Sequence, residues 1–208
     1  MNPAVVTHLP GGFASLKFHS ALMGRSSAAI VWLHGTGERG NDLTLVAKYG
    51  LPAAIDQRRL KINADVFCPQ LEVDREWEPS RLAELMSHVR GAYSGSALLG
   101  FSLGALGVCE ALAELGPQAD LHIAIALRTR RLPVVQQVGT NFLSVSGEHD
   151  LWPAGSEYCR QLRDLGASVE EVVLPNEGHF IAEAALWHTT SVRALRAMGI
   201  QLAPPHEA

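Results

Sequence analysis

The chain has 208 residues, of which 47% are hydrophobic and 18% are charged, and this balance is typical of a folded globular domain rather than a disordered chain. Its formal charge of −4 excludes the basic surface expected of a nucleic-acid-binding protein. No segment approaches the ~20 consecutive apolar residues that a transmembrane helix needs. We therefore expect a single domain over residues 1–208, with no nucleic-acid partner and no membrane span.

The ends of the chain and the cysteines show no pattern typical of a signal peptide, a disulfide framework or a metal site. Residues 1–12 lack the basic start and apolar stretch of a signal peptide and are treated as a short lead-in, and residues 202–208 are predicted to be a frayed tail. The three cysteines (Cys68, Cys109 and Cys159) form no CxxC pair, which argues against a disulfide framework or a zinc site. We expect reduced thiols, no metal and a cytoplasmic location.

Short apolar runs alternate with longer helical patterns along the chain. Strands are predicted over residues 29–33, 64–68, 96–101, 121–127, 141–146 and 169–174, and helices over residues 81–89 (with Ser80 as a candidate N-cap), 103–115, 154–165 and 182–198. Several strands are apolar at consecutive positions, which indicates burial on both faces of a sheet. The pattern predicts an α/β fold with a doubly wound, mostly parallel sheet, in which ligands bind beyond the carboxyl ends of the strands.

One predicted strand runs directly into Gly100-Phe101-Ser102-Leu103-Gly104, and a helical pattern follows at once. This G-x-S-x-G pattern is typical of a sharp turn that presents a serine hydroxyl above a helix N-terminus. The free N–H groups there favour developing negative charge. The pattern alone is weak, because a glycine-containing turn with a surface serine would give the same match. The strand before it and the helix after it favour Ser102 as a nucleophile.

Two later strand ends carry the residue types that a nucleophilic serine needs. Gly147-Glu148-His149-Asp150 follows one predicted strand, and Gly178-His179-Phe180 follows the last. An imidazole must take the proton from the serine hydroxyl, and a carboxylate orients that imidazole. We predict His179 as the base and Asp150 as the acid, because serine, acid and histidine then follow a known chain order. Glu148 is the alternative acid, although it lies nearer the end of the strand.

A glycine-rich run, His34-Gly35-Thr36-Gly37-Glu38-Arg39-Gly40, follows the strand predicted at 29–33. Such a turn can aim backbone N–H groups into a site, and we assign an oxyanion hole to the N–H groups of Thr36 and Leu103. His34 precedes the nucleophile in the chain, so we expect it to shape the loop rather than act as the base. Glu38 and Arg39 either pair across the loop or stay solvated.

Together these motifs resemble the phospholipase/carboxylesterase branch of the α/β-hydrolase superfamily. The matching elements span residues 30–180 and are Leu33-His34-Gly35-Thr36-Gly37-Glu38-Arg39-Gly40, Cys68-Pro69-Gln70 with Trp77 downstream, Gly100-Phe101-Ser102-Leu103-Gly104, Gly147-Glu148-His149-Asp150 and Gly178-His179. The resemblance implies a cofactor-free esterase that acts on carboxylic esters and sometimes thioesters. It also implies that Trp77 lies near the acyl pocket, although a core tryptophan is an equal alternative. Trp152 and Phe180 are further candidate substrate-binding residues.

The sequence also departs from this family. Leu103 stands where many relatives carry a polar residue, and Gly37-Glu38-Arg39-Gly40 looks more like the branch of predicted peptidases or polyester depolymerases. The segment between Leu127 and Asn141 is too short for a large cap domain, so an open or shallow site is expected.

We predict a monomeric or homodimeric serine hydrolase that cleaves small-molecule carboxylic esters through an acyl-serine. The alternatives are a thioesterase or peptidase with the same triad, or a hydrolase fold that only binds a ligand. A cysteine-based lactone hydrolase is disfavoured because serine occupies the turn.

Overall fold

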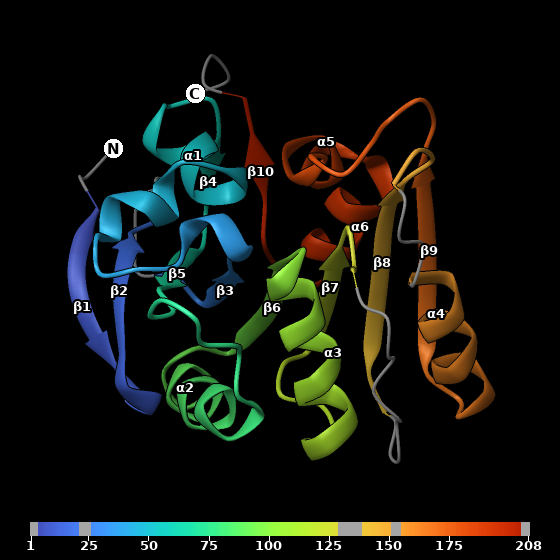
Figure 1. Ribbon diagram of the computed structural model, residues 1–208, viewed down its shortest axis with the longest axis horizontal. Helices are drawn as coiled ribbons and strands as arrows, with labels where there is room; N and C mark the ends of the chain where they lie inside the picture. Colours follow the sequence, from blue (N-terminus) through green and yellow to red (C-terminus); the bar gives the residue numbers. More distant parts are fainter. Residues whose placement is uncertain (1–3, 21–25, 129–138, 151–154, 205–208) are drawn as a thin grey trace.

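An eight-stranded sheet forms the centre of the molecule (Figure 1). Six of its strands, β3 and β5 to β9, run parallel to one another. The computed structural model describes residues 4–20, 26–128, 139–150 and 155–204. The spatial order is β1 (Val5–Leu9), β2 (Phe13–Phe18), β5 (Asp65–Pro69), β3 (Ala28–Leu33), β6 (Gly95–Phe101), β7 (Leu121–Ile125), β8 (Asn141–Gly147) and β9 (Ser168–Leu174). The predicted α/β fold with a mostly parallel sheet is confirmed.

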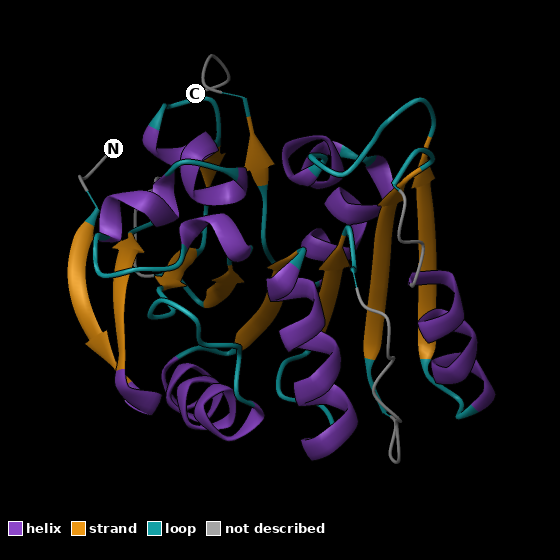
Figure 2. Ribbon diagram, viewed as in Figure 1, coloured by secondary structure: helices purple, strands orange, loops and turns teal. Residues whose placement is uncertain are grey.

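Helices cover both faces of this sheet (Figure 2). They are α1 (Gly50–Asp56), α2 (Pro79–Ala92), α3 (Leu103–Leu115), α4 (Gly155–Asp164), α5 (Ala182–Trp187) and α6 (Thr189–Ala197), with short 3-10 turns η1 (Pro10–Gly12), η2 (Thr36–Glu38) and η3 (Leu43–Ala47). Successive β3 residues alternate between two apolar cores: Ile30 and Trp32 join the core under α1, α5 and α6, whereas Val31 and Leu33 join the core under α2, α3 and α4. Burial on both faces explains the unbroken apolar runs.

Both ends of the chain are more ordered than the sequence predicts. Residues 5–9 of the predicted lead-in form the edge strand β1, which pairs antiparallel with β2 after a turn in which Gly11 and Gly12 have positive φ. Leu202–Ala203 of the predicted tail forms β10, which pairs with β4 (Lys61–Ile62) in a second, two-stranded sheet. β-Branched residues in β1 and the burial of Leu202 stabilise these pairings.

Two helix predictions were wrong in detail. Helix α2 begins at Pro79 after Glu78, without a side-chain cap, so Ser80 lies inside the helix. Proline suits the first helical position because it has no N–H to leave unpaired. The helix predicted over 182–198 is two helices, because His188 has an extended backbone and its ring accepts the N–H of Thr190, which starts α6. None of the helices in the described part of the chain has the length and apolar content to cross a bilayer.

The parallel strands end along one edge of the sheet, and the predicted residues Thr36, Ser102, Asp150 and His179 follow such ends. In the register of the sheet, Leu33 lies beside Gly100, and Gly147 lies beside Leu174. The chain therefore leaves β3, β6, β8 and β9 at the same edge, as the sequence predicts for parallel strands.

A fully buried histidine at the start of β7 ties the opposite edge of the sheet together. The Nε2 atom of His122 accepts the backbone N–H groups of Gln118 and Ala119, each at 3.3 Å, and Nδ1 lies 2.8 Å from Thr140 Oγ1. Because Nε2 accepts, the ring proton is on Nδ1 and is donated to Thr140. Burial lowers the pKa of His122 from 6.5 to about 4.

We predict that His122 makes the protein less stable in acid. Between pH 6.5 and 4 the unfolded chain protonates this histidine but the folded protein does not, so the free energy of unfolding falls as pH falls, by roughly 1 kcal/mol per pH unit from this residue. Urea unfolding between about pH 5 and 6 measures the slope, which His122→Gln should reduce by that amount. His88→Gln, at an exposed position of α2, is the control. An unchanged slope in His122→Gln would contradict this account.

Candidate active site

Ser102 occupies a strained turn between β6 and α3. Its φ of 55° and ψ of −109° lie in a region that non-glycine residues rarely adopt, and its N–H donates to the Ile125 carbonyl of β7 at 2.9 Å. A Cβ on Gly100 would lie 2.1 Å from the Gly104 carbonyl oxygen, and one on Gly104 would lie 2.0 Å from that of Leu33. Both flanking glycines are therefore required by the close approach of α3 to the strands.

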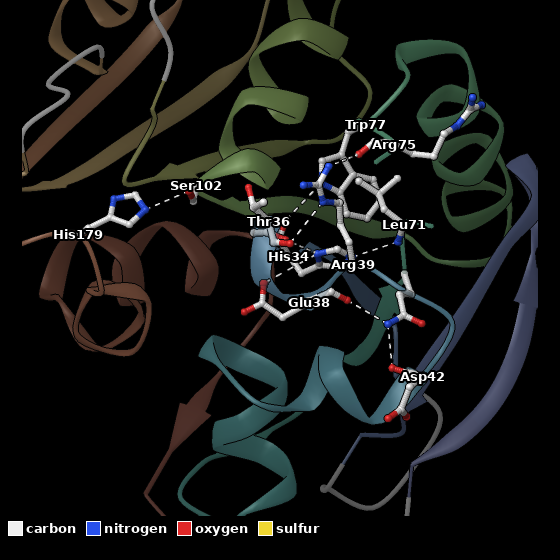
Figure 3. Close-up of polar contacts among 12 residues, drawn as sticks. His34, Thr36, Glu38, Arg39, Asp42, Leu71, Arg75, Trp77, Ser102 and His179 are labelled. Atoms are coloured by element: carbon white, nitrogen blue, oxygen red, sulfur yellow. Dashed lines mark hydrogen bonds and ion pairs between the residues drawn. The ribbon is translucent and has the colours of Figure 1, made fainter. Parts of the chain in front are cut away.

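His179 joins Ser102 to Asp150. Its Nε2 atom lies 3.0 Å from Ser102 Oγ, a contact visible in Figure 3, and its Nδ1 atom lies 2.8 Å from Asp150 Oδ2. The Asp150 side chain is only 2% exposed and that of His179 is 13% exposed. The structure thus brings the three predicted side chains together, with the ring between a hydroxyl and a buried carboxylate.

The loops after β8 and β9 hold one another in place. A Cβ on Gly147 would lie 2.1 Å from the Gly178 carbonyl oxygen, so the two loops touch through their backbones. The His149 N–H donates to the Glu177 carbonyl at 2.7 Å. Glu148, the alternative acid, instead accepts the N–H of Asn176 at 2.8 Å through Oε2. Of the two carboxylates, Asp150 is therefore the one that contacts the histidine.

The second carboxylate oxygen of Asp150 has a cation beside it. Oδ1 is fully buried and accepts no hydrogen bond from the described residues, and the Nε atom of Arg128 lies 3.7 Å away. Arg128 follows β7 and is 40% exposed. Sequence reasoning missed this residue, since nothing in its local pattern relates it to Asp150.

His34 fixes the glycine-rich loop after β3. Its Nε2 atom accepts the N–H of Leu71 at 3.0 Å, and its Nδ1 atom donates to the Gly35 carbonyl at 2.6 Å. Burial lowers the pKa of His34 to about 4, so the ring is neutral at pH 7. Its own carbonyl accepts the indole N–H of Trp77 at 3.2 Å. Both ring nitrogens are occupied, which leaves His34 with the loop-shaping position that the sequence indicates.

The backbone N–H groups of Thr36 and Leu103 belong to the first residues of η2 and α3. The first N–H groups of a helix have no acceptor within the helix and attract negative charge. Figure 3 shows Thr36 on the loop beside Ser102. The two predicted oxyanion donors thus lie at helix starts, Leu103 directly after Ser102 and Thr36 on the loop beside it.

Gln70 is a second clamp on this loop that sequence reasoning did not assign. Its Nε2 atom donates to the carbonyls of Glu38 at 2.9 Å and Asp42 at 2.8 Å. Arg39 donates to the carbonyls of Thr36 and Arg75 rather than pairing with its neighbour Glu38. The Cys68-Pro69-Gln70 motif could have signalled this role, because it places a long amide side chain at the end of β5.

Solved structures share this arrangement of sheet and helices. The chain superposes on a thermostable esterase with a TM-score of 0.66 and 16% identity, covering 93% of this chain and 62% of that one. It superposes on a lidless serine hydrolase from Xanthomonas campestris with a TM-score of 0.64 and 17% identity over 93% of each chain. This chain has the α/β-hydrolase fold. An α/β serine hydrolase homologue from Coxiella burnetii also matches, with a TM-score of 0.58 and 18% identity over 87% of this chain and 90% of that one. No protein-family model and no curated protein matches the sequence.

Within this α/β-hydrolase fold the three candidate substrate residues have different positions. Trp77 is 1% exposed and packs on Phe13 and His34, so of the two positions that the sequence left open it has the core position and not the one in an acyl pocket. Its large ring fills the space that Gly107 of α3 leaves open. Phe180 is 78% exposed beside His179. Trp152 lies outside the described residues.

The prediction about a cap domain falls partly on residues 129–138, which also lie outside the described residues. Strand β7 ends at Ile125 and β8 begins at Asn141, which leaves no room for a large inserted domain. A cavity of about 580 Å³ lies at the amino ends of the strands, where Gly95, Asp120 and Asn141 line it. It is therefore at the edge of the α/β-hydrolase sheet opposite Ser102.

We predict that Gly104→Ala destabilises the protein by about 3 kcal/mol, because the new methyl group would meet the Leu33 carbonyl oxygen at 2.0 Å and backbone must move to relieve the contact. Gly37→Ala is the matched control, since a Cβ there has no atom within 4 Å. Thermal unfolding of both variants measures the difference. Equal stability of the two variants would show that the backbone of α3 is not packed as closely against the end of β3 as described.

Proposed function

We propose that the protein is a serine hydrolase that cleaves carboxylic esters of small molecules through an acyl-serine intermediate. The single observation that carries the proposal is the His179 ring, whose two nitrogens lie within hydrogen-bonding distance of Ser102 Oγ and Asp150 Oδ2. A nucleophile, a base and a group that orients the base are the three parts that acyl transfer to serine needs.

In the first step Ser102 Oγ attacks the ester carbonyl carbon while its proton moves to His179 Nε2. The carbonyl oxygen gains negative charge, which the N–H groups of Thr36 and Leu103 stabilise together with the N-terminus of α3. The bond to the alcohol oxygen then breaks, and the alcohol takes the proton from Nε2. Water attacks the acyl-serine by the same route in reverse, which releases the carboxylic acid and restores the serine.

Asp150 would hold the histidine ring in the orientation that this sequence of proton transfers needs. Its carboxylate is buried and contacts Nδ1, so Nδ1 carries a proton and Nε2 is free to accept one. The carboxylate also stabilises the positive charge that the ring gains when it takes the serine proton. Arg128 faces the other oxygen and limits the number of orientations available to the carboxylate.

Two observations support catalysis over ligand binding alone. The strained backbone of Ser102 has a free-energy cost of about 1–3 kcal/mol, which a surface serine in a binding protein has no reason to keep. The His179 ring also contacts both Ser102 and Asp150, so the three side chains form one connected set.

Thioesters and amides would react through the same steps, so a thioesterase or a peptidase is the second candidate. The solved structures with this fold include proteins described as esterases, which supports the ester substrate.

We predict that Ser102→Ala, His179→Ala and Asp150→Asn each lower kcat for a simple nitrophenyl ester, by about 10⁴–10⁶ for the serine and the histidine and by about 10⁴ for the aspartate. Glu148→Gln is the matched control, because its carboxylate contacts only a backbone N–H of the neighbouring loop. If Glu148→Gln abolished turnover and Asp150→Asn did not, the acid would be wrongly assigned.

We also predict a preference for esters over amides with the same acyl group. The amide nitrogen is a poorer leaving group than an ester oxygen and must be protonated before it leaves. Among the described residues only His179 contacts Ser102 Oγ and could supply that proton. The measurement compares kcat/KM for an oxygen ester, a thioester and an anilide of one acyl chain. Faster cleavage of the anilide than of the ester would favour the peptidase alternative.

A further inference from the structure

Three aromatic rings lie in contact beside the proposed nucleophile and base. Phe101, directly before Ser102, packs against His179 with ring centroids 5.2 Å apart. Tyr49 packs on Phe101 at 4.8 Å, and Phe180 packs on Tyr49 at 5.7 Å with the two ring planes at 88°. We call Tyr49, Phe101 and Phe180 the aromatic edge. It joins the segment before α1 to the loop that carries the base.

Part of this aromatic edge is open to a ligand. Phe101 is 4% exposed and packs against the other two rings. Phe180 is 78% exposed, the highest value among the large hydrophobic residues of the described chain. Tyr49 is partly buried, and its hydroxyl accepts the N–H of Ala182 at 3.1 Å. An exposed aromatic face beside a reactive group is a surface that a substrate can cover.

A carboxylate without a cationic hydrogen-bond partner among the described residues lies against the same edge. One oxygen of Glu38, Oε2, is fully buried and accepts no hydrogen bond from the part of the chain that the structure describes. A Cβ on Gly35 would lie 3.3 Å from this oxygen and 3.2 Å from the ring of Phe101, so the carboxylate and the ring both lie next to that glycine. In Figure 3 the Glu38 side chain extends from the glycine-rich loop, which also carries Thr36.

The residues around Glu38 do not neutralise it. His34 Nδ1 is 3.9 Å from Oε2, but that ring is neutral at pH 7 and its proton is donated to Gly35. Arg39 is engaged by the carbonyls of Thr36 and Arg75. Burial raises the pKa of the Glu38 carboxyl, and the backbone N–H groups of Glu38 and Gly35 offset this only in part.

Glu38 lies beside the ring on which the rest of the aromatic edge packs. Its Oε2 atom and the Phe101 ring both lie within 3.3 Å of the Cβ position of Gly35, and Tyr49 and Phe180 pack against Phe101. Burial raises the pKa of Tyr49, the Ala182 N–H lowers it, and the negative charges of Glu38, Glu183 and Glu177 raise it further.

We infer that this site selects esters that carry an ammonium group, with Glu38 supplying the opposite charge and the rings of Tyr49 and Phe180 supplying cation–π contacts. A carboxylate and aromatic faces together are the surroundings that a quaternary ammonium group prefers, because such a group is weakly hydrated and bears a diffuse charge. Binding would also place a cation beside the Glu38 carboxylate, whose Oε2 atom has no hydrogen-bond partner among the described residues. The inference rests on the proposed ester hydrolysis and adds the charge of the substrate.

The test uses two butyrate esters of equal shape, one of choline and one of 3,3-dimethylbutanol, which differ in the charge of the terminal group. Each kcat/KM is divided by the rate constant for alkaline hydrolysis of the same ester, because the charged alcohol is the better leaving group. We expect the wild-type ratio to favour the choline ester by roughly tenfold, a factor that one cation–π contact together with one partly buried charge pair can supply.

Glu38→Gln should lower this ratio by roughly tenfold. The ratio compares two substrates in one variant, so a change in stability or in the glycine-rich loop cancels. Glu114→Gln removes the same charge at an exposed position near the end of α3 and should leave the ratio unchanged. Phe180→Leu keeps an apolar side chain but removes the ring, and should lower the ratio by a smaller factor.

A second measurement uses the wild-type protein alone. Tetramethylammonium chloride should inhibit hydrolysis of the uncharged ester competitively, whereas sodium chloride at equal ionic strength should not. Equal inhibition by the two salts would overturn the inference, as would a wild-type ratio of one or a ratio that Glu38→Gln leaves unchanged. If neither ester is hydrolysed, the proposed function itself fails; if only the uncharged ester is, the function stands and the charge selection does not.

Discussion

The backbone of Gly104 lies so close to the end of β3 that even a methyl group on its Cα would come within 2.0 Å of the Leu33 carbonyl oxygen. Gly100 is limited in the same way by the Gly104 carbonyl. With α3 held this tightly against β3 and β6, the chain turns between strand and helix only by placing Ser102 at a positive φ. The hydroxyl, the N-terminus of α3 and the loop after β3 are thereby brought to one place.

The remainder of the site is held around this turn mainly by uncharged contacts. His34 and Gln70 tie the glycine-rich loop to the end of β5 with hydrogen bonds that need a neutral ring and an amide. The loops that carry Asp150 and His179 touch through the backbones of Gly147 and Gly178. Because salt screens interactions between charges, these hydrogen bonds between neutral groups keep the site geometry independent of salt concentration. The carboxylates of Asp150, which has Arg128 beside it, and of Glu38 can then act on the base and on a substrate.

The sequence predicted most of the fold, because strands buried on both faces of a parallel sheet give unbroken apolar runs and because glycines mark the close contacts. It also pointed to Ser102, Asp150 and His179, since each follows a strand that ends at the same sheet edge. It did not predict the partners that come from distant segments. Arg128 meets Asp150, and Gln70 meets Glu38, only once the strands are side by side.

The differences between prediction and structure have similar physical causes. The family resemblance implied that Trp77 lies near an acyl pocket, but the absence of a side chain at Gly107 lets its ring pack into the core, the alternative that the sequence left open. The two ends of the chain contain turn residues that suggested loose segments. Pairing with β2 and with β4 orders residues 5–9 and 202–203, because backbone hydrogen bonds to a neighbouring strand outweigh weak local preferences.

The central claim is that the strained turn makes one serine of this chain a nucleophile. The most direct measurement treats the folded protein with a fluorophosphonate and locates the adduct by peptide mass spectrometry. This account predicts a single adduct on Ser102, formed slowly or not at all when His179 is replaced. Modification at another residue, or undiminished labelling of the Ser102→Ala variant, would contradict it.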